Sequence, residues 1–367
     1  MTQSPRRLDI TKFTISTPCK FVGERLSDIY EISRVHENYR IKGYSATPNE
    51  RMYREFLEVT VKTPEYDKKT IVIPDYSNIG EDFCVALTVL FGKRFDNHGL
   101  SFQHGTPYIP SVDNVIRIYN KNLTFNSLTR RVDFPLELNI DNFKFIENVV
   151  FMQDEETSEA QAAFFYAGRF YVQAIRTVED SPELAFLGLI TSGEILASYF
   201  KYPVDDLLDN DTKTLLEELK NSGVAGERLR KKVQAKLMAI SASFCKFLLE
   251  CLDDDFFERS EAKNNFERID KTYIKQRLKE AYNLRSKYVH AGQSHSGWMS
   301  VNSLLDNPEI IHGNPVIEDK DLQKSIKRSP TFIGLERIIR YSLIKFLVRT
   351  KIIDDFAMAF ANKQALN

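Results

Sequence analysis

The sequence predicts an α+β chain of two domains, a mixed, strand-containing domain over residues 1–152 and an all-helical domain over residues 157–367. Three observations lead to this prediction. Residues 56–62 alternate apolar and polar side chains, which is typical of a strand. Residues 153–157, Gln-Asp-Glu-Glu-Thr, form a polar break. Beyond the break, apolar residues recur at the three- and four-residue spacing of amphipathic helices.

The N-terminal elements follow from short local patterns. Residues 70–73, Thr-Ile-Val-Ile before Pro74, indicate a second strand. Residues 79–95 fit a helix with a polar start at Asn78. Residues 115–119 and the Phe-rich stretch 134–151 indicate further strands or buried loops. The many aromatic residues and scattered prolines give this half an α+β or β-rich character.

The C-terminal half is predicted to be helical almost throughout. Ser181 is a candidate cap, and Pro182 stands where a first-turn proline belongs. A polar loop containing Trp298 is expected over 293–330, and an acidic stretch over 205–218. The predicted helices span 158–178, 182–200, 227–252, 265–290 and 332–351.

Composition and charge limit the classes of function. The net charge is −1, so no whole-protein field draws the chain onto nucleic acid, and any phosphate-binding surface must be local. The start of the chain leads into no apolar core, so we expect no signal peptide. The least polar stretch, 184–200, is short and contains Glu194, which argues against a membrane span. These features predict a cytoplasmic protein.

Cofactor and metal motifs are not found in the sequence. The four cysteines form no C-x-x-C pair, which favours free buried thiols in a reducing compartment. His98 and His104 lack an identifiable third metal ligand, so they are expected to be turn residues. The glycines have no phosphate-loop spacing, and no G-x-S-x-G occurs. We therefore expect no metal and no other cofactor.

The strongest functional candidates are Arg285 and His290, near the end of the predicted helix 265–290. Arg285 continues the apolar stripe of Ile274, Leu278 and Ala281, where a charge is costly unless it has a partner. Arginine carries a permanent planar charge suited to phosphate. Histidine titrates near neutrality and can transfer protons there. Together the two side chains could cut RNA without a metal.

The spacing of this pair leaves two alternatives. On an ideal helix the five-residue step from Arg285 to His290 turns about 140° around the axis. The two side chains share a site only if the helix ends or tightens between them, or if the long arginine reaches across. Gly292 makes a helix end here plausible. The alternative is that His290 caps the helix and Arg285 forms a structural salt bridge.

Four lysines of the same region are candidate RNA-binding residues. Lys271, Lys275 and Lys279 form a stripe beside Arg285, and Lys287 follows within the motif. The stripe is either a solvated helix face or a track for an RNA backbone.

The residues around the pair resemble a known family. Residues 284–292, Leu-Arg-Ser-Lys-Tyr-Val-His-Ala-Gly, resemble the R-x4-H signature of HEPN domains, in particular the Apea-like HEPN group associated with bacterial abortive infection. Residues 184–197 are similar to the early helix of the family with its inward acid, here Glu194. Residues 334–343 are similar to its closing helix. The resemblance covers about residues 158–352; the N-terminal region resembles no family that we can name from its residues.

The resemblance implies an antiparallel helical bundle that forms a homodimer and acts as a metal-independent endoribonuclease. The ribose 2′-OH would attack the adjacent phosphorus, giving a 2′,3′-cyclic phosphate and a 5′-OH. His290 would transfer protons, and Arg285 would stabilise the transition state. Glu194, Ser286 and Tyr288 would support them. Many active members carry Asn or another polar residue directly after the arginine; Ser286 is polar but shorter.

Several roles remain open at this point. Glu194 either pairs with Arg285 or is a surface acid. His295 is expected to be a loop residue rather than a second base, and the 293–330 loop could cover the site. Arg337 and Arg340 either pair with acids in the bundle or add positive potential near Arg285.

Two further questions concern the whole chain. The N-terminal domain is expected to sense a trigger derived from a phage, or to restrain the nuclease. The rival function is a non-catalytic RNA- or nucleotide-binding and dimerisation module. A catalytic N-terminal domain has no motif to support it.

Overall fold

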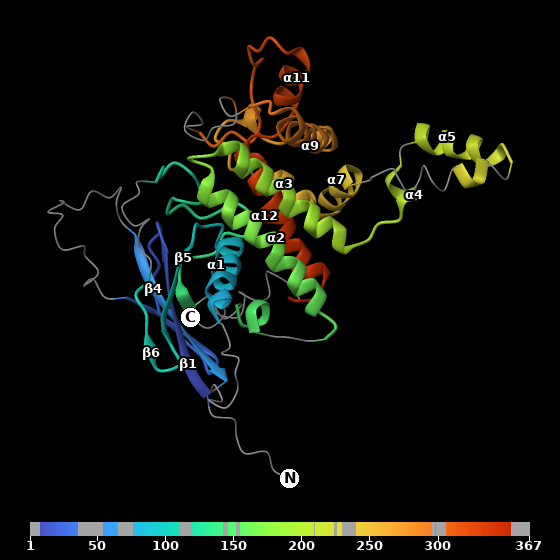
Figure 1. Ribbon diagram of the computed structural model, residues 1–367. Helices are drawn as coiled ribbons and strands as arrows, with labels where there is room; N and C mark the ends of the chain where they lie inside the picture. Colours follow the sequence, from blue (N-terminus) through green and yellow to red (C-terminus); the bar gives the residue numbers. More distant parts are fainter. Residues whose placement is uncertain are drawn as a thin grey trace.

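The computed structural model describes residues 8–35, 54–64, 76–110, 119–141, 146–151, 155–208, 210–223, 226–229, 240–295, 298 and 306–353. An antiparallel sheet lies at one end of the molecule, and helix α1 (Ser77–Phe91) lies between this sheet and the remaining helices (Figure 1). The chain is therefore α+β, as the sequence predicts.

The sheet has the strand order β2-β3-β4-β1-β5-β6. In β1, Phe13 and Ile15 point toward the core, and in β4, Leu57 and Val59 do the same. This period-two burial confirms the strand predicted at 56–62. The strands are β1 (Leu8–Thr17), β2 (Arg25–Leu26), β3 (Tyr30–Arg34), β4 (Glu55–Pro64), β5 (Asp96–Gln103) and β6 (Thr106–Pro107).

The other N-terminal predictions need correction or lie outside the described residues. Helix α1 ends at Phe91 rather than Phe95, because Gly92 adopts the left-handed conformation that terminates a helix, with φ of 59°. The predicted strand 70–73 and residues 115–118 lie outside the described residues. Of the two alternatives for 134–151, the described parts show the partly buried loop: they contain bends, an isolated bridge from Asn139 to Val22 and a five-residue π-helix, Glu147–Phe151.

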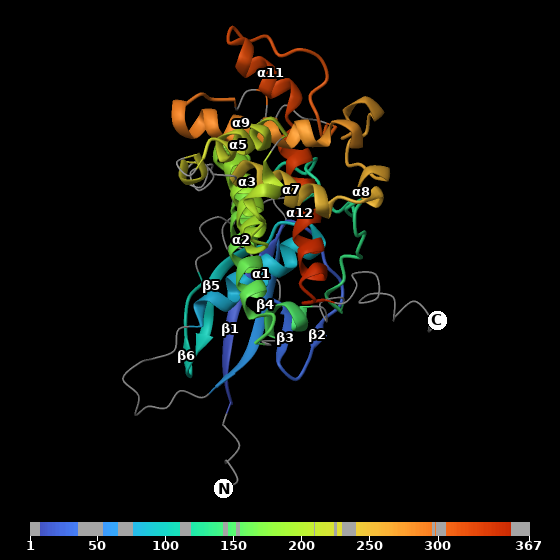
Figure 2. The same ribbon diagram turned by 90° about the vertical axis from the view of Figure 1, so that its right-hand side faces the viewer.

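The helical half is built around five packed helices, α2 (Ser158–Thr177), α3 (Pro182–Tyr199), α7 (Ile240–Cys251), α9 (Ile274–Ala291) and α12 (Phe332–Arg349) (Figure 2). Pro182 occupies the first turn of α3 after Ser181, as predicted. The shorter helices are α4 (Val204–Leu207), α5 (Asn210–Asn221), α8 (Asp254–Glu258) and α11 (Lys320–Arg328).

Three boundaries in this half differ from the predictions. The acidic stretch 205–218 contributes to α4 and α5, which project from the body (Figure 1). The predicted helix 265–290 begins only at Ile274, because short 3₁₀ turns, Asn265–Glu267 and Lys271–Tyr273, precede it. The predicted loop 293–330 contains α11, whose first turn is capped by Asp319. Of the predicted helix 227–252, residues 230–239 lie outside the described part.

One hydrophobic core runs through both halves of the chain. Its buried residues include Phe13 and Leu57 of the sheet, Leu87 of α1, and Leu189 and Ile339 of the bundle. The predicted boundary near residue 153 falls among residues that the structure does not describe, and α1 packs directly on α2 and α12. The two sides of that boundary therefore bury their apolar surfaces against each other. The four cysteines are free thiols.

Candidate functional site

Helix α9 presents one apolar side to the bundle, and this side fixes the orientation of the motif. Ile274, Leu278, Ala281 and Leu284 are its buried residues. Arg285 follows directly and lies about 20–100° around the axis from them, within the apolar stripe. Its side chain is 24 % exposed. The helical spacing thus turns Arg285 toward the core, and the partial exposure of its side chain places the charge at the border with solvent.

Arg285 is held by two side chains. Its Nη2 lies 3.6 Å from Oε2 of Glu194 on α3, and its guanidinium carbon lies 5.5 Å from the centre of the Tyr282 ring. Tyr282 donates a hydrogen bond of 2.8 Å to the other carboxylate oxygen of Glu194. The structure thus shows the pairing of Glu194 and Arg285 that was one of the two alternatives. Arg285 Nε has no hydrogen-bond partner among the described residues.

Tyr282 was not identified from the sequence, although it stands three residues before Arg285, at a spacing where helical side chains meet. Burial, followed by the hydrogen bond to Glu194, raises the pKa of Tyr282 to about 12. The phenol therefore keeps its proton at neutral pH and remains a donor to the carboxylate. Glu194 is oriented by this bond even if Arg285 moves away.

Gly193 determines how closely α3 approaches its neighbours. A Cβ at this position would lie 2.6 Å from Cε2 of Phe244 on α7 and 3.1 Å from Cδ1 of Ile339 on α12. A larger residue would push these helices apart. Because Glu194 is the next residue, the contact with Phe244 and Ile339 also sets the position of the carboxylate that holds Arg285.

His290 lies apart from Arg285 within one chain. The helix continues to Ala291 and ends at Gly292, whose φ is 62°, so it neither ends nor tightens between the two residues. They are thus about 140° apart around the axis and about 7.5 Å along it. His290 is exposed, whereas Arg285 turns toward Tyr282 in the preceding turn. One protomer alone does not bring this pair into a shared pocket.

The lysines and Ser286 occupy different environments. Lys275 and Lys279 are exposed, Lys287 and Ser286 are half-buried, and Lys271 pairs with Asp254 at 2.5 Å. On an ideal helix, Lys275, Lys279, Ser286 and His290 fall within about 60° of one another. They therefore form a polar strip along the outer side of α9, which we call the outer strip.

Tyr288 and His295 form an aromatic contact at the end of α9. His295 is 3 % exposed, and its ring centre lies 5.6 Å from Phe186 on α3 and 6.0 Å from Tyr288. Neither ring nitrogen has a hydrogen-bond partner among the described residues. Burial lowers the pKa of His295. The negative charge of Glu183 raises this pKa by a smaller amount, so the neutral imidazole is favoured. His295 is a loop residue, as predicted, and it is buried.

The start of the 293–330 loop fastens α9 to its neighbours. Ser294 Oγ donates to Glu183 Oε1 at 2.5 Å, and Gln293 Nε2 donates to Asp319 Oδ2 at 3.2 Å. These contacts hold the residues after α9 against the start of α3 and the start of α11. Residues 296–297 and 299–305 lie outside the described part, which leaves the predicted cover over the site a prediction.

The prediction of turn residues is wrong for His98, which lies within strand β5, and is confirmed for His104, which lies in the turn between β5 and β6. His98 Nε2 is 2.6 Å from Ser16 Oγ, and His104 Nδ1 is 3.1 Å from Asp9 Oδ2. Across the described residues, no group of three or more His, Cys, Asp or Glu side chains could hold a metal ion. No helix in that same part of the chain combines the length and apolar character needed to cross a membrane.

No protein-family model, no curated protein and no solved structure matches this chain.

Proposed function

We propose that this protein is a metal-independent endoribonuclease of the HEPN type, with Arg285 and His290 as its reactive residues. The observation that carries the proposal is the setting of Arg285. A guanidinium at the edge of a packed core is costly, yet here it is oriented by Glu194 and Tyr282 and its side chain remains 24 % exposed. Preorganised donors of this kind suit a phosphate that gains charge in a transition state.

The proposed reaction is a transesterification within RNA. The ribose 2′-oxygen forms a bond to phosphorus while the bond from phosphorus to the 5′-oxygen breaks. A base takes the proton of the 2′-OH, and an acid gives a proton to the leaving 5′-oxygen. The products are a 2′,3′-cyclic phosphate and a 5′-OH. His290 is the proton-transfer group, and Arg285 donates to the non-bridging oxygens of the phosphate.

The divergence of the two side chains makes a homodimer part of this proposal. Arg285 and His290 point to different sides of α9, so a second copy has to bring its His290 toward the Arg285 of the first. The distance of 3.6 Å to Glu194 is long for an ion pair, so an RNA phosphate can compete for the guanidinium.

The outer strip is the proposed track for the RNA backbone. Lys275 and Lys279 are exposed and lie on the same side of α9 as His290. Lys271 contributes less, because Asp254 already neutralises it. By the resemblance, the biological setting is bacterial defence against phage by abortive infection, with the N-terminal region responding to a trigger derived from the phage.

The primary test is RNA cleavage in excess EDTA by the wild type, Arg285→Ala and His290→Ala, with the exposed His312→Ala as the matched control. The wild type and the control are expected to cut, with cyclic-phosphate ends identified by mass spectrometry. Both site variants are expected to lose at least about 100-fold in kcat, the scale of general acid–base and electrostatic contributions. Site variants as active as the control would refute the assignment.

Mixed dimers test whether the site is shared between copies. If Arg285 of one copy acts with His290 of the other, combining the two inactive variants restores one intact site per mixed dimer. If both residues act within one chain, mixing restores nothing. Stable RNA binding by the wild type without product would instead favour the non-catalytic binding module, which the exposed position of His290 also permits.

A further inference from the structure

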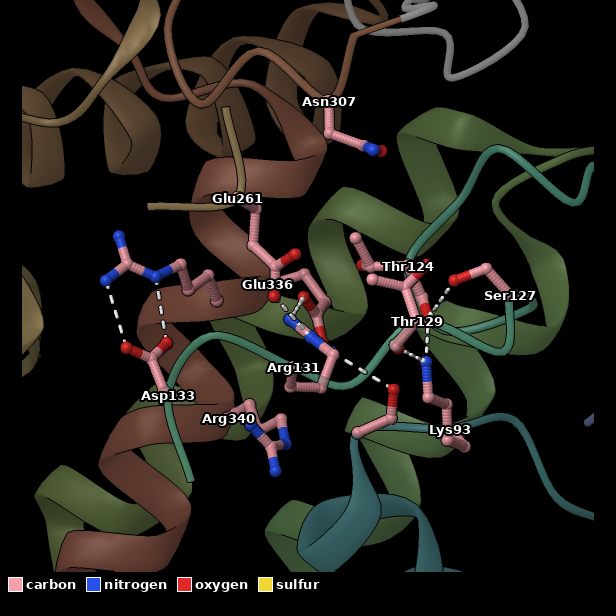
Figure 3. A network of polar contacts seen from close by, with 12 residues as sticks. Lys93, Thr124, Ser127, Thr129, Arg131, Asp133, Glu261, Asn307, Glu336 and Arg340 are labelled. Carbon is pink, nitrogen blue, oxygen red and sulfur yellow. Dashed lines mark hydrogen bonds and ion pairs between the residues drawn. The ribbon is translucent and has the colours of Figure 1, made fainter. Parts of the chain in front are cut away.

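A second set of charges, outside the candidate site, connects the N-terminal half to the bundle. It contains four cations and four carboxylates, all of them nine-tenths or more buried as side chains. Figure 3 shows the part of the set around Arg131. The balance of charge argues for an internal clamp rather than a site for an ion. The members are Lys93, Arg131, Arg337, Arg340, Asp133, Glu261, Glu309 and Glu336.

Helix α12 is bound by this network to the segment 131–133. Arg131 makes two hydrogen bonds to Glu336, of 2.9 and 2.6 Å. Asp133 accepts two from Arg337, of 2.8 and 3.0 Å. Arg340 donates to the carbonyls of Val89 and Leu90 at the end of α1, at 2.8 and 2.6 Å. Three side chains of one helix are therefore fixed by N-terminal residues.

The same network reaches the segment that precedes α9, the helix that carries Arg285 and His290. Arg131 Nε donates to Glu261 at 2.6 Å, and Arg337 Nη1 donates to Glu309 at 2.9 Å. Glu309 in turn accepts the backbone N–H groups of Glu261 and Ile269, at 2.8 and 3.0 Å. Ile269 is five residues before the start of α9. The anchoring of α9 thus depends on a carboxylate that Arg337 holds, and Asp133 of the N-terminal half holds Arg337 in turn.

A shorter route reaches Arg285 through α12 itself. Ile339, between Arg337 and Arg340, packs on the position of Gly193, beside Glu194. The charged side of α12 faces the N-terminal half, and its apolar side meets the glycine next to the acid that orients Arg285. A shift of α12 therefore moves both the start of α9 and the carboxylate of Glu194.

We infer that Arg131 and Asp133 are positioning residues for the motif helix, so that the N-terminal half controls the geometry of the candidate site through this clamp. The inference rests on the proposed function only for its catalytic consequence. The structural part, that residues 131–133 hold the segment 261–273 in place, stands on the contacts alone. A trigger bound to the N-terminal half would act by loosening or tightening this clamp.

The deciding experiment is hydrogen–deuterium exchange of Asp133→Asn, with Arg130→Gln as the control three residues away. Arg130 pairs with Glu137 at the surface, so its loss leaves the clamp intact. Asp133→Asn is expected to speed exchange at least about tenfold in peptides covering 261–273, because a buried charged hydrogen bond is lost. Peptides of α7, residues 240–251, serve as the internal reference and are expected to change less.

Exchange in 261–273 that is unchanged, or that rises equally in α7, would overturn the inference. If Asp133→Asn does not fold, Glu261→Gln tests the same link, since it keeps Asp133 and Arg337 intact. The catalytic consequence is a kcat for RNA cleavage about tenfold lower at unchanged KM, and an unchanged kcat would overturn the positioning role. A wild type that cuts no RNA would refute the proposed function, while the exchange result would still decide the clamp.

Discussion

Replacing Glu336 by glutamine is the sharpest test of the buried charge network. The carboxylate has no exposed surface and accepts three hydrogen bonds. Arg131 provides two, of 2.9 and 2.6 Å, and the hydroxyl of Tyr171 provides the third, of 2.6 Å. Glutamine has nearly the same shape, but it removes the charge and turns an amide donor toward groups that are themselves donors.

The expected loss follows from these contacts. A hydrogen bond to a charged group contributes about 1.5–3 kcal/mol, and a glutamine oxygen retains at most part of the three. Removing one member of a buried ion pair costs about 3–5 kcal/mol, because the remaining charge stays buried. We therefore expect Glu336→Gln to lower the free energy of unfolding by about 3–5 kcal/mol, a large part of the stability of a typical domain.

Urea unfolding at pH 7 measures this loss, and Glu137→Gln is the matched control. Glu137 accepts from Arg130 at 3.0 Å, but the two side chains are 61 % and 56 % exposed, so its loss should cost less than about 1 kcal/mol. Equal effects of the two substitutions, or a loss below about 1 kcal/mol at Glu336, would refute the reasoning.

The pH dependence gives a second check on the same residue. Burial raises the pKa of Glu336, but the charge and hydrogen bonds of Arg131 outweigh it and hold the pKa below its ordinary value of 4.5. The carboxylate is therefore a stronger acid in the folded than in the unfolded chain. Its stabilising effect is complete above pH 4.5 and is lost as the pH falls through the folded value. The difference between wild type and Glu336→Gln should shrink accordingly.

Three further outcomes follow from the structure. Gly193→Ala should lower the free energy of unfolding by about 1–3 kcal/mol in urea, because its Cβ would overlap Phe244, whereas Gly188→Ala, with its nearest contact at 3.2 Å, should cost less. Tyr282→Phe should reduce kcat for RNA cleavage while costing only about 1 kcal/mol in stability, so an unchanged kcat would count against its role. The wild type should lose stability between pH 7.5 and 5.5, because burial lowers the pKa of His295 and its protonation below the ordinary value of 6.5 opposes folding. In His295→Phe this loss should be smaller. Urea midpoints that shift equally with pH in the variant and the wild type would contradict this.

The helices of the bundle could be predicted because their signals are local. Residues 158–177 and 332–349 carry regular apolar spacing, and Pro182 marks the start of α3. The strand β4 was predictable for the same reason, since its alternation lies within one short segment. These elements need no knowledge of what they pack against.

The remaining strands depend on partners far away in the chain. β1 pairs with β4 and β5, from Leu8↔Pro64 to Lys12↔Phe102, and neither pairing leaves a local mark. β5 contains Gly99 and several polar residues, so its own composition does not favour a strand. The start of α9 was placed too early because Asn265–Tyr273 have helical turns without a continuous helix.

Within the candidate site, the partner of Arg285 could be predicted from the sequence, whereas the contribution of Tyr282 and the geometry could not. The pairing of Arg285 with Glu194 follows from the cost of a charge on an apolar stripe, whereas the outward position of His290 required the true end of α9. For Arg337 the structural alternative is confirmed, because it pairs with Asp133 and Glu309. No pattern near Arg337 points to Asp133, since the two lie on opposite sides of the polar break.

The contacts of Arg131 with the helical half have a practical consequence for expressing that half alone. A polypeptide that begins at residue 157 would keep Glu336 and Arg337 but lack the arginine and the aspartate that neutralise them. Such a fragment should be insoluble when expressed alone and recover when the missing piece is co-expressed. The two halves would then behave as a split protein that reassembles when both are present.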